Sequence, residues 1–183
     1  MKRLVYLSVL FALALASISA RAQEARSSSA SPSHFPPRVS FTSFDKARIG
    51  MGESALATAL GAPLIHADPV AEEEGCYYAE GRGLPAGVGL MMLDGRLARI
   101  DVTERGVSTI SGVGVGTLEA DVKRIYGAKL VQETHAYTGP EGHYLTLLSP
   151  DRTAGIRFET DGNVVTGFYA GTAKAIRYIE GCQ

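Results

Sequence analysis

Two segments of the chain, residues 50–61 and 116–127, repeat one pattern without a gap. Each begins and ends with glycine, has glutamate at its fourth position (Glu53 and Glu119) and continues with alanine. Farther along, the Asp-Gly pair at 94–95 matches the pair at 161–162, so the offset between the copies changes only from 66 to 67 residues. One residue gained or lost in a loop explains that change. The chain therefore repeats a whole structural unit, and both copies are expected to fold alike.

Each unit is predicted to begin with a short helix. In the second copy, apolar residues recur at positions i, i+4, i+7 and i+8, which places them on one helical stripe: Leu118, Val122, Ile125 and Tyr126. Gly127 can end this helix by adopting a left-handed conformation. Leu56 and Leu60 repeat the stripe in the first copy. Both helices therefore present one apolar side to a core.

Four strands are predicted after each helix, because the apolar pattern there changes to a period of two. They cover 64–67, 76–80, 88–93 and 97–102 in the first unit, and 129–137, 143–149, 155–160 and 164–170 in the second. The two Asp-Gly pairs are typical of two-residue hairpin turns. A last strand is predicted at 176–179.

The predicted fold class is α+β, with two tandem helix-plus-antiparallel-sheet repeats that form one domain. The repeats cover about 47–104 and 112–171, and the domain, with its C-terminal strand, covers 41–183. A unit of about 66 residues buries too little surface to be stable alone. The two copies are therefore expected to share one core.

The first 22 residues have the pattern of a secretory signal peptide. Lys2 and Arg3 precede an apolar stretch from Leu4 to Ala16, and cleavage is predicted near Ala22. The apolar stretch is shorter than the roughly 20 residues that span a bilayer, so no transmembrane segment is expected in the mature chain. Residues 23–40 are rich in serine and proline, which predicts a disordered linker. The mature protein is therefore expected to be periplasmic or secreted.

The charge of the mature chain argues against a nucleic-acid partner. Cleavage removes Lys2, Arg3 and Arg21 from the 18 basic residues, which leaves 15 against 19 acidic residues and a formal charge of −4. Binding to phosphates depends on clustered lysine and arginine, and the sequence has no basic cluster.

Two cysteines remain after cleavage, Cys76 and Cys182. An even number of cysteines in an oxidising compartment favours a disulfide. A pair of redox-active thiols is the alternative, but these residues lack the C-x-x-C spacing that lowers a thiol pKa. A structural disulfide that ties the C-terminal region to the first repeat is therefore predicted.

The repeated helix pattern G-x-x-E-x-x-[LV]-x-x-x-[LY]-G, followed by strands with an Asp-Gly hairpin, resembles two groups of exported bacterial proteins. One is the β-lactamase inhibitor protein fold, in which tandem units pack helical elements on an antiparallel sheet. The other is the small outer-membrane lipoprotein of the barrel assembly machinery, which carries a single such unit. The resemblance covers about residues 47–171 and implies a binding or assembly module without catalytic activity. It carries over no individual inhibitory residue.

Tyrosines on the predicted strands are candidates for ligand contact. Adjacent strand residues point to opposite faces, so one ring of Tyr77-Tyr78 and one ring of Phe168-Tyr169 must face outward. Exposed tyrosine offers a large contact area with a polar tip, which suits protein or glycan binding. The predicted binding residues are Tyr78, His135, Tyr137 and Tyr169.

A second hypothesis is a small metal-dependent hydrolase that uses His135, Glu141 and His143, which crowd one predicted hairpin. A zinc site normally has three or four protein ligands with an orienting shell, and no third histidine is placed to help. No metal, other cofactor or catalytic residue is therefore predicted. The acidic run Glu72–Glu74 is interpreted either as a solvated turn or as a contact for a basic partner.

The sequence thus predicts an exported, non-enzymatic binding protein, either a proteinaceous inhibitor or an envelope interaction module. Its expected partner is another envelope or extracellular protein. A structural role in envelope assembly is the third hypothesis.

Overall fold

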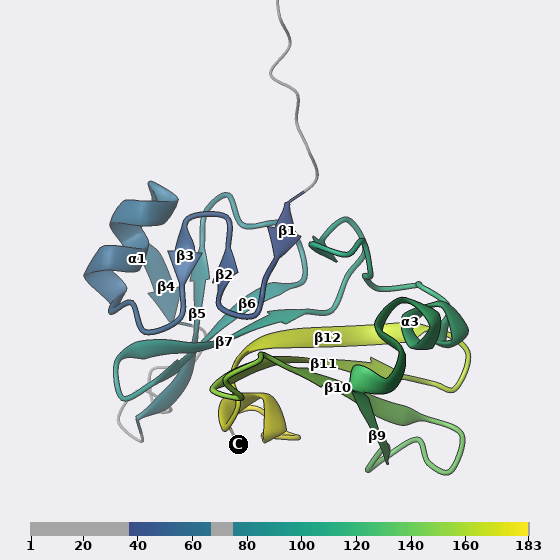
Figure 1. Cartoon of the computed structure of the whole chain (residues 1–183). Helices are drawn as coiled ribbons and strands as arrows, with labels where there is room; N and C mark the ends of the chain where they lie inside the picture. Colours follow the sequence, from purple (N-terminus) through teal and green to yellow (C-terminus); the bar gives the residue numbers. More distant parts are fainter. Residues whose placement is uncertain (1–36, 67–74, 183) are drawn as a thin grey trace, which may run out of the picture. The chain divides into compact units, whose positions relative to one another are not determined.

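The structure, a computed structural model, describes residues 37–66 and 75–182 (Figure 1). The predicted signal peptide, its cleavage site, most of the predicted linker and the acidic run Glu72–Glu74 lie outside these residues. The fold class is α+β, as predicted, because strands in two sheets accompany two short α-helices in the described part of the chain.

Strands and short helical segments follow one another along the described part of the chain. They are β1 (Arg38–Val39), β2 (Ser43–Phe44), β3 (Ala47–Arg48), α1 (Glu53–Leu60), β4 (Leu64–His66), β5 (Cys76–Gly81), β6 (Val88–Leu93), β7 (Arg96–Val102) and β8 (Ser108–Thr109), then α3 (Glu119–Tyr126), the 3₁₀ turn η1 (Gly127–Lys129), β9 (Leu130–Thr134), β10 (His143–Leu148), β11 (Ala154–Thr160), β12 (Val165–Thr172) and the 3₁₀ turn η2 (Ala175–Arg177).

The main sheet has eight strands in the order β4-β5-β6-β7-β12-β11-β10-β9. Every neighbouring pair is antiparallel. β7 and β12 lie side by side at the centre, where Val102 of β7 faces Phe168 of β12 and Ile100 faces Ala170. The sheet is therefore two four-stranded meanders joined edge to edge at β7 and β12.

The small sheet has the order β3-β2-β1-β8, with β1 parallel to β8. Its first strand includes Arg38 and Val39, which the sequence placed in the linker 23–40. Val39 is fully buried and packs in the core, so the folded part begins before the predicted boundary at residue 41. The few apolar residues of this serine- and proline-rich stretch show no periodicity from which a strand could be predicted.

Most predicted strands are confirmed to within two residues, and the prediction at 88–93 matches β6. β9 is the main exception, because it ends at Thr134 and not at Tyr137. There Nδ1 of His135 accepts hydrogen bonds from the backbone N–H groups of Tyr137 and Thr138, at 3.1 and 3.2 Å. The histidine side chain thus closes a turn where a longer strand was expected.

The two Asp-Gly hairpins differ in loop length. Leu93 pairs with Arg96, so Asp94 and Gly95 form the predicted two-residue turn, both with positive φ. In the second unit Thr160 pairs with Val165, which leaves a four-residue loop in place of the predicted two-residue turn. Oδ1 of Asp161 accepts hydrogen bonds from two backbone N–H groups inside this loop, each at 2.8 Å, and stabilises the longer form.

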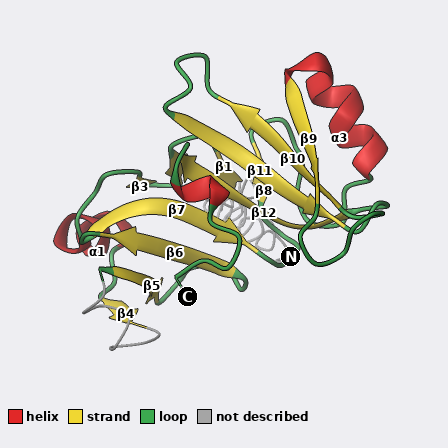
Figure 2. Cartoon of the chain, turned by 90° about the horizontal axis from the view of Figure 1, so that it is seen from below, coloured by secondary structure: helices red, strands yellow, loops and turns green. Residues whose placement is uncertain are grey.

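The prediction of a C-terminal strand at 176–179 is wrong. The segment forms η2, and the backbone oxygens of Ala175 and Tyr178 accept hydrogen bonds from the Arg99 side chain and not from a neighbouring strand. Figure 2 shows this short turn lying over the main sheet near β7 and β12. η2 contacts β7, β11 and β12, so the C-terminal segment covers a face of the sheet and does not extend its edge.

The main core lies on the opposite face of the sheet, under the helices and the small sheet. Leu56 of α1, Val122 of α3 and Phe44 of β2 pack there with buried strand residues such as Leu90, Ile100, Phe158 and Phe168. The predicted stripe of α3 is only partly covered, because Leu118 and Ile125 are 55% and 39% exposed. Both described helices have eight residues, too few to cross a bilayer.

Candidate binding site

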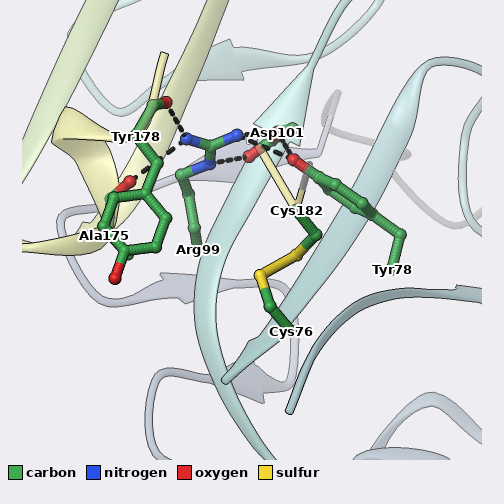
Figure 3. Close-up of a disulfide and its surroundings, with 7 residues drawn as sticks. All are labelled: Cys76, Tyr78, Arg99, Asp101, Ala175, Tyr178 and Cys182. Atoms are coloured by element: carbon green, nitrogen blue, oxygen red, sulfur yellow. Dashed lines mark hydrogen bonds and ion pairs between the residues drawn. A yellow bond between two sulfur atoms is a disulfide. The ribbon is translucent and has the colours of Figure 1, made fainter. Parts of the chain in front are cut away.

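Arg99 of β7 is the buried centre of the face that η2 covers, with 3% of its surface exposed (Figure 3). Nη1 donates to the backbone oxygens of Ala175 and Tyr178, at 3.1 and 2.7 Å. Nε and Nη2 donate to the two carboxylate oxygens of Asp101, and Nη2 also donates to Oη of Tyr78, each at 2.7 Å. All five N–H donors of the guanidinium are therefore used, and they join the C-terminal segment to β5 and β7.

The predicted disulfide between Cys76 and Cys182 is confirmed, with Cα atoms 5.3 Å apart. It fixes the C-terminal segment to β5 beside the Arg99 network (Figure 3). A small apolar cluster, separate from the main core, surrounds the disulfide: Met91, Ala98, Ala175, Tyr78, Leu93 and Tyr178. The C-terminal segment is thus held on the sheet by a covalent bond, by two hydrogen bonds from Arg99 and by an apolar cluster.

A cleft of about 430 Å³ opens between the C-terminal segment, the central strands and the loop between β9 and β10. Its walls include Tyr78, Asp101, Tyr137, Glu159, Tyr169 and Glu180. Gly167, which pairs with Glu159 across β11 and β12, also lines the cleft. We call this the tyrosine–carboxylate cleft.

Each tyrosine of the cleft donates a hydrogen bond to a carboxylate: Tyr78 to Asp101, Tyr169 to Glu159 and Tyr137 to Glu180. Burial and then the charge of Asp101 raise the pKa of Tyr78, and burial followed by the charge of Glu159 raises the pKa of Tyr169. The hydrogen bond to Glu180 raises the pKa of Tyr137. The hydroxyl protons are therefore retained and engaged, so the cleft presents aromatic rings and unused acceptor positions of three carboxylates.

The structure brings the four predicted binding residues together. Tyr78, Tyr137 and Tyr169 line the cleft, and Nε2 of His135 lies 3.7 Å from Oε2 of Glu159, which also lines it. The His135 ring stacks on Tyr144, with 4.4 Å between ring centroids. Tyr137 is 64% exposed, whereas Tyr169 is 6% exposed and lies under the guanidinium of Arg99, 4.4 Å from its ring centroid. Ligand contact by these residues stays a prediction.

Sequence reasoning missed the charged residues of the cleft. Arg99 and Asp101 alternate with the buried residues Ile100 and Val102, so their spacing placed both on the outer face of one strand. That signal could have identified the pair. Glu159 shows the same alternation in β11, between the buried residues Phe158 and Thr160. Glu180 carried no such signal, because it reaches the cleft only through the return of the C-terminal segment.

The residues of the hydrolase hypothesis are not brought together. His143 and Tyr144 are neighbours in β10 and point to opposite faces of the sheet. Nδ1 of His143 lies 3.0 Å from Oε2 of Glu119 in α3, while His135 stacks on Tyr144 on the other face. Among residues 37–66 and 75–182, no three His, Cys, Asp or Glu side chains are placed to hold a metal ion.

Glu119, which begins α3, ties that helix to the sheet with a side chain that is 5% exposed. Its carboxylate interacts with the Lys123 ammonium at 2.6 Å, with His143 and with the Thr160 hydroxyl. Burial acts to raise the pKa of Glu119, but the hydrogen bonds to the carboxylate outweigh burial and hold this pKa below its ordinary value. The ionised form is therefore favoured in the folded protein.

Glu119→Gln is expected to lower the free energy of unfolding at pH 7 by about 1–3 kcal/mol. A depressed pKa in the folded state contributes stability that is complete above the ordinary value of 4.5 and is lost as the pH falls through the folded value. The difference between wild type and variant should therefore shrink below about pH 4 in urea titrations. Glu141→Gln, in the exposed turn of the β9–β10 loop, serves as the control and should change stability little at any pH. A difference in the free energy of unfolding between wild type and Glu119→Gln that stays constant down to pH 3 would contradict this account.

Comparisons with known proteins do not assign a function to the cleft. No family model matches the chain, and no curated protein matches it. A solved structure that matches is that of the uncharacterized protein yfeY from Escherichia coli, at 17% sequence identity and a TM-score of 0.48; the match covers 73% of this chain and 99% of that chain. The resemblance to β-lactamase inhibitor proteins and to the small barrel-assembly lipoprotein stays a prediction.

Proposed function

We propose that the chain is an exported, non-enzymatic binding protein whose ligand site is the tyrosine–carboxylate cleft. The observation that carries the proposal is the convergence of Tyr78, Tyr137 and Tyr169 on one cleft, each bonded to a carboxylate. The signal-type N-terminus supports export to the periplasm or beyond, and so does a disulfide, since disulfides persist in oxidising compartments.

The chemistry of the cleft favours a cationic ligand group. Three carboxylates line the cleft, those of Asp101, Glu159 and Glu180. Arg99 is the basic side chain among the described lining residues, and its donors are already engaged. Aromatic faces attract lysine and arginine side chains, and carboxylates accept their N–H bonds. A basic segment of another envelope or extracellular protein therefore fits the cleft best.

We also infer that the two meanders are tandem copies of one helix-plus-sheet unit. The matching glycine and glutamate positions at 50–61 and 116–127 support this, as does the mirrored strand order on either side of the β7–β12 pair. The cleft takes Tyr78 and Asp101 from the first unit and Glu159 and Tyr169 from the second. Joining the units at this pair thus creates a site that neither unit has by itself.

Titration with a hexa-arginine peptide tests the cleft directly. Wild type should bind the peptide with an affinity that falls as salt is raised, because exposed charges are screened. Tyr137→Ala and Glu180→Gln should each weaken binding by about 3- to 30-fold, which corresponds to about 0.7–2 kcal/mol for an aromatic or charge contact. Glu141→Gln lies outside the cleft and should leave binding unchanged.

Equal weakening by Glu141→Gln and Glu180→Gln would mean a non-specific charge effect and would remove the support for the cleft. Affinity capture from an envelope fraction, with wild type and Glu180→Gln as baits, then distinguishes an inhibitor of a soluble enzyme from an envelope assembly module. A captured soluble enzyme supports an inhibitor, and captured outer-membrane components support an assembly module. Proteins captured equally by both baits count against the site.

A further inference from the structure

A second pocket, of about 700 Å³, lies on the helix side of the main sheet, opposite the tyrosine–carboxylate cleft. It forms where α3 meets the residues after β1, the residues after β8 and the adjoining ends of β10 and β11. Leu147 and Ile156 are paired across β10 and β11 and form part of its floor. This volume falls within the range of about 300–1,000 Å³ that is usual for small-molecule sites.

The walls of this pocket are mainly apolar, and two of their isoleucines are uncovered. Ile110 is 66% exposed and Ile125 is 39% exposed, while Phe41, Tyr126 and Leu148 complete the apolar lining. Ile125 belongs to the apolar stripe of α3, whose pattern predicts burial. Apolar side chains gathered around a concave surface mark a site for an apolar group.

The rim of the pocket is positively charged. Lys129 is the charged side chain among the described lining residues; it is exposed and makes no ion pair with a described residue. Nη1 of Arg38 donates to the backbone oxygen of Ile110 at 3.0 Å, which places a guanidinium beside the same rim. Asp151 directly follows the lining residue Pro150, and its carboxylate accepts hydrogen bonds from Ser149 and Thr153 within its own turn. A ligand with an apolar chain and an anionic head therefore complements this pocket.

We propose that this pocket binds a free fatty acid, with the acyl chain between Ile110, Ile125 and Leu147 and the carboxylate at Lys129. The acyl chain covers the exposed isoleucines, and the head group pairs with the lysine ammonium at the solvent-facing rim. The proposal is independent of the tyrosine–carboxylate cleft, because the two sites share no lining residue and lie on opposite faces of the sheet.

Calorimetric titration of the full chain with dodecanoate, below its micelle concentration, tests this site. Saturable binding is expected, and Ile125→Asp should weaken it about 10- to 100-fold, because the apolar contact between Ile125 and the acyl chain is lost and a carboxylate faces the ligand. Lys129→Glu should weaken dodecanoate about 2- to 10-fold and leave dodecanol unchanged, since only the charged head group meets this residue. Ile65→Asp is the matched control, because Ile65 is 53% exposed on β4 and outside the pocket.

Thermal denaturation shows whether each variant is folded. If Ile125→Asp does not fold, Ile110→Asp takes its place in the titration, since Ile110 is the more exposed residue. Absence of saturable binding, or equal weakening by Ile65→Asp and Ile125→Asp, would overturn the proposal. So would a dimer in sedimentation that Ile125→Asp converts to a monomer without any dodecanoate binding, because a second copy would then occupy the pocket. Equal effects of Lys129→Glu on dodecanoate and dodecanol would overturn the assignment of the head group.

Discussion

The double replacement Cys76→Ser and Cys182→Ser is expected to lower the free energy of unfolding by about 4–5 kcal/mol. The disulfide joins residues 106 positions apart, so its loss restores much conformational freedom to the unfolded chain. For a protein of this size the melting temperature should fall by about 10–20 °C. Chemical denaturation of wild type with and without reductant, beside the double variant, measures the loss.

Reduced wild type serves as the control for this variant and should match it, because the two lack the same covalent bond. Hydrogen exchange should also become faster in residues 173–182, since only noncovalent contacts, among them those with Arg99, the apolar cluster and Tyr137, then hold that segment. Two thiols that react with an alkylating reagent in the native protein would show that the disulfide does not form. An unchanged midpoint on reduction would show that the disulfide does not constrain the unfolded chain.

Arg99→Met should destabilise the protein by about 3–5 kcal/mol, the cost of removing one partner from a buried ion pair. The substitution leaves Asp101 without its counter-charge and two backbone oxygens of the C-terminal segment without donors. Arg96→Met is the matched control in the same strand, because Arg96 is exposed and makes one hydrogen bond, to the backbone oxygen of Gly50 at 3.0 Å. That control should cost less than about 1 kcal/mol.

A double-mutant cycle separates the ion pair from the rest of the Arg99 network. Asp101→Asn removes the charge, and Arg99→Met combined with it should cost less than the sum of the two single changes, by about 1–3 kcal/mol. Urea denaturation of the four proteins gives this coupling energy. Additive losses in the free energy of unfolding would mean that Arg99 stabilises the fold through the aliphatic part of its side chain and its bonds to the C-terminal segment, and not through Asp101.

The strands and the disulfide could be predicted because their signals are local or come from simple chemistry. Alternation and turn residues located β6 and its Asp-Gly turn, and two cysteines have one pairing available within a chain. The C-terminal turn could not be predicted, since its backbone oxygens are satisfied by Arg99, more than 70 positions earlier in the chain. No local pattern in the sequence predicts a hydrogen-bond donor that lies so far away along the chain.

The residues of the cleft also divide into those that local sequence patterns predict and those that depend on distant parts of the chain. Tyr78 and Tyr169 could be identified from neighbouring aromatic residues on strands, because one of each pair must leave the main core. Their carboxylate partners depend on how strands from both halves of the chain lie side by side, which only the sheet order specifies. On α3 the periodicity was correct for Val122 but overestimated burial at Ile125, because helical spacing says which residues share a side and not how far a neighbour covers it.

The β7–β12 pair also determines how many ligands one chain can hold in the tyrosine–carboxylate cleft. A chain with two similar halves could carry two equivalent sites, one on each half. The main sheet contains this junction once, and the cleft takes residues from both of its sides, so the expected stoichiometry is a single ligand per chain. A ligand seated there touches both meanders at once and should hold them together, so that the two halves of the sheet unfold at one common, raised midpoint.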